Sequence, residues 1–137
     1  MDLRWVAVGR SGSPEVNDKK SGIVVLDADA SRIQVLDLQG RPRTAFKIRS
    51  VNAQGTVAKM GLAVDDASHI YVSKLSNDIR INDQEGQLLG SLERPTSVAT
   101  FSQPSGMWID STGLIYVADT RNSRVQVFEV RHAASKR

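Results

Sequence analysis

The sequence predicts an all-β protein built from three similar units, and three observations support this prediction. Residues 115–128, which read Ile-Tyr-Val-Ala-Asp-Thr-Arg-Asn-Ser-Arg-Val-Gln-Val-Phe, form two runs of alternating apolar residues around a polar turn. Residues 23–36 match this segment position for position, and residues 70–81 match it with one residue deleted. The three segments start 47 and 45 residues apart. A fixed period of this size in an all-strand unit is typical of the blades of a β-propeller.

Each unit is expected to contain four antiparallel strands, named here innermost, second, third and outermost in chain order. In the first unit, residues 3–8 form a strand, 9–22 a long polar loop, 23–36 the strand pair and 40–49 the outermost strand. The third unit has no room for a good outermost strand, because only seven mostly polar residues follow position 130. We therefore expect one domain of eleven strands, with blades over 3–49, 60–94 and 104–130 and a polar tail over 131–137.

Two features of the first unit leave alternatives open. Residues 3–8 form either the innermost strand of the first blade or an outermost strand donated to the third blade. The loop over 9–22 is either a tolerated surface insertion or a segment that contacts a partner.

The composition excludes several classes of protein. Cysteine is absent, which excludes a disulfide framework, a thiolate nucleophile and a cysteine metal site. Neither a signal peptide nor an apolar run of about 20 residues is visible, so we expect no membrane partner and slightly favour the cytoplasm. A net charge of +3 does not by itself imply a polyanionic partner.

The repeated residues resemble the NHL-repeat family of β-propellers. The third unit carries Pro-Ser-Gly-Met-Trp-Ile-Asp at 104–110, followed by the strand pair up to Phe128, and it fits the family pattern nearly throughout. The second unit fits over 61–92 but has Lys74 where the family usually has Asp, and the first fits over 23–48. The resemblance implies a ring that usually closes with six blades. It implies no single activity, since such propellers serve as RNA readers, protein scaffolds and lyases.

Charged pairs flank the turn between the second and third strands. Asp27 with Arg32, and Asp119 with Arg124, are placed to form ion pairs that hold the turn in shape. In the second unit Lys74 replaces the Asp and the Arg is missing, so both partners are lost together. The residues of these turns predicted to contact a ligand are Lys74, Arg121 and Asn122.

Three blades cannot close a ring, so the two end blades would each expose an apolar face. Such a face is larger than the apolar patches that a monomer normally shows. Two copies related by a two-fold axis would supply six blades, and we therefore expect a homodimer. The alternative is that the chain is half of a longer propeller polypeptide.

Candidate metal ligands are sparse. His69 and His132 are isolated from each other in the sequence, and a His metal site needs two or three converging ligands. Asp65 and Asp110 end the innermost strands and are weak candidates for calcium, although Asp at such positions commonly serves the turn. We expect no cofactor.

A basic stripe follows one face of the first outermost strand and consists of Arg41, Arg43, Lys47 and Arg49. It either contacts phosphates or an acidic partner, or it is a solvated edge whose cations discourage aggregation.

The leading hypothesis from the sequence is a non-catalytic propeller module that binds a protein or other ligand through its loops and forms a ring by self-association. The alternatives are a propeller lyase or hydrolase with a metal in the central channel, and an RNA-binding propeller.

Overall fold

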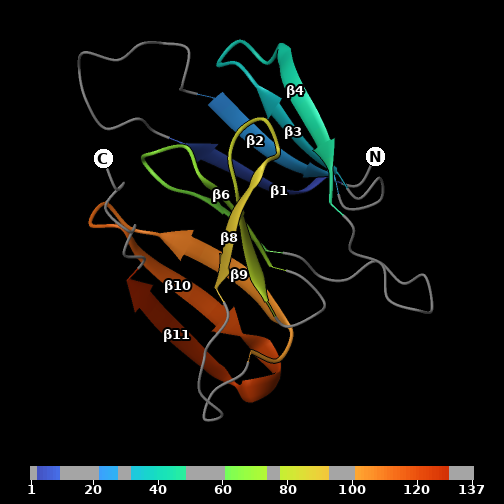
Figure 1. The fold of residues 1–137 in the computed structure, drawn as a ribbon. Coiled ribbons are helices and arrows are strands. Elements are labelled where there is room, and N and C mark those ends of the chain that lie inside the picture. Colours follow the sequence, from blue (N-terminus) through green and yellow to red (C-terminus); the bar gives the residue numbers. More distant parts are fainter. Residues whose placement is uncertain are drawn as a thin grey trace, which may run out of the picture.

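The computed structural model describes the main chain of residues 3–9 and all atoms of residues 22–27, 32–48, 61–73, 78–92 and 101–129. These residues form three antiparallel sheets that lie side by side like blades of a fan (Figure 1). Blade 1 contains β1 (Leu3–Gly9), β2 (Gly22–Asp27), β3 (Arg32–Leu36) and β4 (Pro42–Lys47). Blade 2 contains β5 (Leu62–Val64), β6 (Ile70–Ser73), β7 (Ile79–Asn82) and β8 (Leu88–Leu92). Blade 3 contains β9 (Pro104–Ile109), β10 (Leu114–Asp119), the 3₁₀ turn η1 (Thr120–Asn122) and β11 (Arg124–Glu129).

The predicted all-β class and its propeller-like blades are confirmed. Strands follow the chain order within blades 1 and 2, and the three-strand blade 3 lacks a fourth strand among the described residues. The strand β1 pairs with β2 from Leu3 opposite Asp27 to Gly9 opposite Gly22, so it is the innermost strand of blade 1. The alternative of a strand donated to blade 3 is therefore wrong. The innermost strands β1, β5 and β9 of successive blades contact one another.

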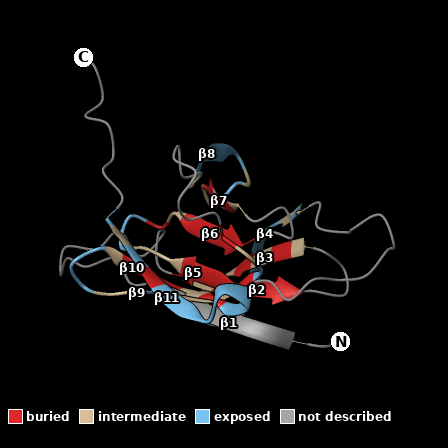
Figure 2. Cartoon of the chain, turned by 90° about the horizontal axis from the view of Figure 1, so that it is seen from below, coloured by how far each residue is buried: buried red, intermediate tan, exposed pale blue. Residues whose placement is uncertain are grey.

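Apolar alternation along the strands packs each blade against the next. We call the side of a blade that faces the following blade its forward face, and the opposite side its rear face. The forward face of blade 1 packs against the rear face of blade 2 through Val24, Leu26, Ile33 and Val35 on one side and Leu62, Ile70 and Val72 on the other. The forward face of blade 2 packs against blade 3 through Ala63, Tyr71, Ile79 and Ile81, which meet Phe101, Ile115 and Val117. Buried segments therefore concentrate between the sheets (Figure 2).

The outermost strands carry the features of an edge. Pro42 is the first residue of β4 and has no N–H to donate. This is tolerated because no strand lies on the outer side of β4 in the described part of the chain. Both β4 and β8 join their sheets with a register shift at the start, between Val35 and Leu36 and between Ile81 and Asn82. None of the helices in the described ranges is long and apolar enough to cross a membrane.

Gly86 and Gly113 form a natural pair for testing how much blade packing contributes to stability. Both have positive φ, +91° and +88°, so Ala at either position is strained by about 1–2 kcal/mol. A Cβ at Gly86 would also lie 2.5 Å from Cγ of Phe46 on blade 1, whereas a Cβ at Gly113 meets open space. We expect Gly86→Ala to lower the free energy of unfolding by about 1–3 kcal/mol more than Gly113→Ala, measured by urea denaturation. Equal losses would show that the Gly86 turn does not press on blade 1.

Candidate functional site

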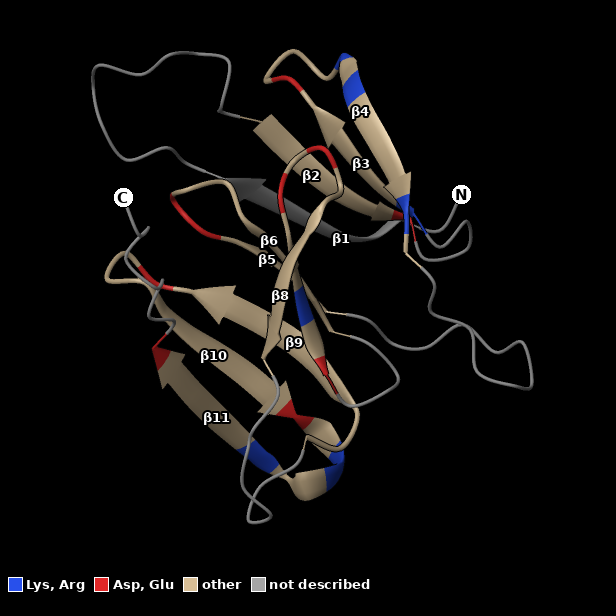
Figure 3. Cartoon of the chain, in the orientation of Figure 1, with Lys and Arg blue, Asp and Glu red and all other residues tan. Residues whose placement is uncertain are grey.

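One rim of the blades is formed by four turns of a single design, which begin at Asp37, Asp65, Asp83 and Asp110. The antiparallel order places the turns from innermost to second strand and from third to outermost strand on this rim. In each turn the Asp carbonyl accepts the N–H three residues later, over 3.0–3.2 Å. Its Oδ1 accepts the N–H groups two and four residues later, over 2.8–3.0 Å. This is an Asx turn, in which the side chain replaces main-chain partners. Acidic residues accordingly mark all four turns (Figure 3).

The second oxygens of Asp65 and Asp110 are occupied by neighbouring side chains. Oδ2 of Asp65 accepts the Tyr71 hydroxyl at 3.0 Å and lies 2.9 Å from Nδ1 of His69. Oδ2 of Asp110 accepts the Tyr116 hydroxyl at 3.1 Å. The hydrogen bond from Thr112 is the main cause of a lowered pKa of Asp110, and the bond to Asp110 raises the pKa of Tyr116. Burial is the main cause of the raised pKa of Tyr71.

These contacts bear on the candidate calcium ligands. Both carboxylates, Asp65 and Asp110, are already engaged by turn N–H groups and a tyrosine, so a cation would have to displace those donors. No group of three or more His, Asp or Glu side chains able to hold a metal occurs in the described ranges. His132 lies outside those ranges, while His69 lies beside Asp65.

The opposite rim contains a buried carboxylate, Asp119, whose side chain is 0% exposed. Its Oδ1 accepts the N–H of Ser102 at 2.6 Å. Its Oδ2 accepts Asn122 at 2.8 Å, Arg124 at 2.9 Å and Gln126 at 2.7 Å. The predicted pair of Asp119 with Arg124 is therefore part of a larger network that ties β10, η1 and β11 to the segment before β9. Sequence reasoning did not identify Ser102 or Gln126, because only the folded chain brings them to the carboxylate.

The hydrogen bonds around Asp119 control its ionisation. Burial alone would raise the pKa of this carboxyl group, since it disfavours the charged form. Donors from Asn122, Ser102, Gln126 and Arg124 outweigh this effect and lower the pKa to about 2. The side chain is therefore a carboxylate at neutral pH and stabilises the turn through its charge.

Blade 1 repeats the ion pair in a simpler form. Arg32 Nε donates to Oδ2 of Asp27 at 3.1 Å, and its Nη2 lies 3.0 Å from the same oxygen. The corresponding turn of blade 2, which contains Lys74, lies outside the described residues.

The basic stripe on β4 is divided by its contacts. Arg41 donates to Asp37 at 2.7 Å and so belongs to an Asx turn. Arg43 and Lys47 are exposed on β4, and Arg49 lies outside the described residues. All three described cations of the stripe are therefore exposed, and Arg41 also pairs with Asp37.

The forward face of blade 3 is open and apolar. Val125 is 63% exposed and Val127 is 48% exposed. The equivalent positions of blades 1 and 2 are Ile33, Val35, Ile79 and Ile81, and these are between 0% and 9% exposed. Trp108, which is 62% exposed, packs against Tyr116 on the same face with ring centroids 5.3 Å apart. Within the part of the chain that the structure describes, no further sheet covers this apolar face.

Comparison with known proteins connects this architecture to a family. Residues 101–128, which span the open-faced blade, match the family model of the NHL repeat. The chain is 33% identical to human NHL repeat-containing protein 3 over 58% of its own length. Residues 101–128 form an NHL repeat. The family resemblance expected from the sequence is thereby confirmed.

This chain spans less than half the length of the proteins that it matches. The matched region spans 28% of human NHL repeat-containing protein 3. Virginiamycin B lyase from Staphylococcus aureus is similar in structure, with a TM-score of 0.54 and 14% identity over 93% of this chain and 41% of the lyase. A catalytically inactive form of that enzyme with quinupristin gives a TM-score of 0.52 and 13% identity over 84% of this chain and 40% of the enzyme. At this identity the likeness shows the fold alone.

Two of the residues predicted to bind a ligand, Arg121 and Asn122, lie in the NHL repeat at 101–128 and make different contacts. Arg121 is exposed in η1, and its main-chain N–H donates to the carbonyl of Ser102 at 3.0 Å. The Asn122 amide points back to Asp119. The predicted role of both residues in binding stays a prediction.

The low pKa of Asp119 predicts acid sensitivity of this NHL repeat. The folded-state pKa of about 2 lies below the ordinary value of 3.8, so folding favours the carboxylate. The resulting stability is present above pH 3.8 and is lost as the pH falls towards 2. We expect Asp119→Asn to lower the free energy of unfolding at pH 7 by about 2 kcal/mol and to flatten its decline between pH 4 and 2. The control is Asp66→Asn at an exposed turn residue, which should retain the decline. If the free energy of unfolding of the Asp119 variant fell between pH 4 and 2 as steeply as that of the wild type, Asp119 would not be the cause of the acid sensitivity.

Proposed function

We propose that this chain is a non-catalytic NHL-type propeller module that binds a ligand through its loops and completes a six-bladed ring with a second copy. The observation that carries the proposal is the unequal burial of equivalent positions in the three repeats. Val125 and Val127 stand where blades 1 and 2 bury Ile or Val against the next blade. All three blades have apolar side chains at these positions, but only those of blade 3 are uncovered. Such an exposed apolar face suits packing against another blade.

A second copy supplies a blade of matching design. The rear face of its blade 1 carries Ile23 and Val25 at the positions where blade 2 uses Ile70 and Val72 to receive the preceding blade. Ile23 is half-buried, while Val25 is already covered within the single chain, so docking would depend more on the open face of blade 3. If the two-fold axis coincides with the central axis of the ring, this contact occurs twice, once at each junction between the two copies.

The rim contacts favour binding over metal-dependent catalysis. The carboxylate oxygens of Asp65 and Asp110 accept hydrogen bonds from turn N–H groups and tyrosine hydroxyls. On the opposite rim, Arg121 is exposed on a turn that the Asp119 network holds rigid. A rigid scaffold that displays an exposed Arg suits recognition of an acidic partner group, and Lys74 is proposed to act with it.

The mass of the particle in solution tests the ring. One chain has a mass of 15.0 kDa, so a pair should measure about 30 kDa by light scattering. We expect Val127→Asp to yield a folded monomer, because a carboxylate in a closed blade interface would be desolvated without a partner. The matched control is Leu89→Asp at a residue of β8 that is 50% exposed outside this face, and it should remain a pair.

Two results would overturn the proposal. One is a stable wild-type monomer at concentrations of about 10 μM, where a specific homodimer interface should hold. The other is loss of pairing in the Leu89 variant to the same degree as in the Val127 variant, which would indicate nonspecific association.

A further inference from the structure

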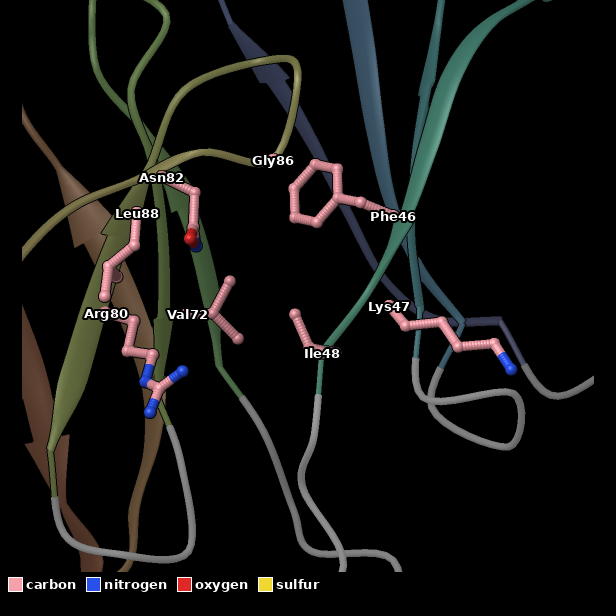
Figure 4. Close-up of a pocket in the computed structure, with 8 residues that line it drawn as sticks. All are labelled: Phe46, Lys47, Ile48, Val72, Arg80, Asn82, Gly86 and Leu88. Atoms are coloured by element: carbon pink, nitrogen blue, oxygen red, sulfur yellow. The ribbon is translucent and has the colours of Figure 1, made fainter.

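A cavity of about 400 Å³ lies between blades 1 and 2, at the edge of their shared core. Figure 4 shows its lining residues, which come from the end of β4 in blade 1 and from β6, β7, β8 and the β7–β8 turn in blade 2. Its volume is within the range of small-molecule sites. It lies wholly within one chain, so it does not depend on completion of a ring.

A buried amide without a partner points into this cavity. Asn82 at the end of β7 is 6% exposed and lines the cavity (Figure 4). Its side chain makes no hydrogen bond to any residue that the structure describes. A buried amide left unsatisfied is costly, and nearly all buried polar groups in proteins have a partner. The amide therefore offers one donor group and one acceptor to a molecule in the cavity.

A guanidinium group stands beside the amide. Arg80 precedes Asn82 by two residues on β7, so the two side chains project from the same side of the sheet. Nε of Arg80 lies 3.9 Å from Oδ2 of Asp78, which is beyond hydrogen-bond distance, and 43% of the side chain is exposed. Arg80 and Asp78 thus form a long ion pair without a hydrogen bond, and the planar donors of Arg80 match the geometry of a carboxylate in the cavity.

The other side chains that line the cavity, among the residues described, are mainly apolar. Phe46 and Ile48 approach from blade 1, and Val72 and Leu88 from blade 2 (Figure 4). Gly86 packs against the ring of Phe46 and closes the cavity on that side. Lys47 points away from the other lining residues in the same view, so it adds no second cation to the cavity.

The next blade interface shows that the cavity is not a necessary consequence of the fold. In blade 3 the positions of Arg80 and Asn82 are taken by Gln126 and Phe128. Gln126 donates to Asp119 at 2.7 Å, and Phe128 packs edge-on against Phe101 with ring centroids 5.3 Å apart. Both side chains there have partners within the chain, whereas Asn82 has none among the residues described. The polar pair on β7 thus distinguishes the first interface from the second.

We propose that this cavity binds a small amphipathic carboxylate. The carboxylate pairs with Arg80 and accepts a hydrogen bond from the Asn82 amide, and the apolar body lies against Phe46, Val72 and Leu88. An isolated inorganic anion would leave the apolar walls uncovered, and a purely apolar molecule would leave the amide unpaired. The cavity favours a ligand with both parts.

The test compares two probes of the same shape, the charged 3-phenylpropanoate and the neutral 3-phenylpropanamide. Dissociation constants are measured by NMR titration of the full chain. We expect the carboxylate to bind roughly tenfold more tightly than the amide, because a hydrogen bond to a charged group is stronger than a neutral one. Inorganic phosphate, as the anion alone, should not compete.

Three variants assign the residues. Arg80→Gln should reduce carboxylate affinity to that of the amide probe, while Lys47→Gln should leave both affinities unchanged. Asn82→Leu should weaken both probes and raise the Tm of the ligand-free protein, since it removes the unpaired amide. A merely structural Asn82 would instead lower the Tm when replaced.

Three results would overturn the proposal. They are equal affinity for the two probes, an Arg80→Gln variant that keeps the preference for the carboxylate, and absence of binding by either probe up to about 10 mM.

Discussion

The structure depends on the covering of each sheet by the sheet that follows it. A single blade buries little on its own, and its apolar side chains are removed from water only when a neighbour packs against them. Val24 and Leu26 are covered by blade 2, and Tyr71 and Ile79 by blade 3. The cavity between blades 1 and 2 is set by the spacing that this packing imposes. On the forward face of blade 3, Val125 and Val127 are not covered by any sheet among the residues that the structure describes.

The two rims are stabilised by different chemistry. The rim of Asx turns uses short-range hydrogen bonds, in which one Asp side chain serves N–H groups within four residues of itself. The opposite rim uses Asp119, which joins residues as far apart in the chain as Ser102 and Gln126. The first design can repeat in any blade because it needs only local sequence. The second needs several correctly placed donors, and blade 1 has the simpler pair of Asp27 and Arg32.

The sequence predicted those parts of the fold that follow from local pattern. Strand alternation and the repeat spacing identified the three blades and the edge position of Pro42. The Asp–Arg pairing at the turns also followed from spacing. The cavity beside Asn82 did not, because it arises from the combined volumes of side chains on two blades that are far apart in sequence. The inward turn of the Asn122 amide was missed for a similar reason, since an Asn in a polar turn normally faces solvent.

The order in which the blades cover one another also has a consequence for biosynthesis. Because each forward face waits for the next blade, a chain leaving the ribosome always carries one uncovered apolar sheet. A repeat of 45 residues takes roughly 2–9 s to synthesise at about 5–20 residues per second. For that interval the newest blade is open to wrong pairing with other nascent chains. Chaperone capture during translation would be most useful just after each third strand emerges.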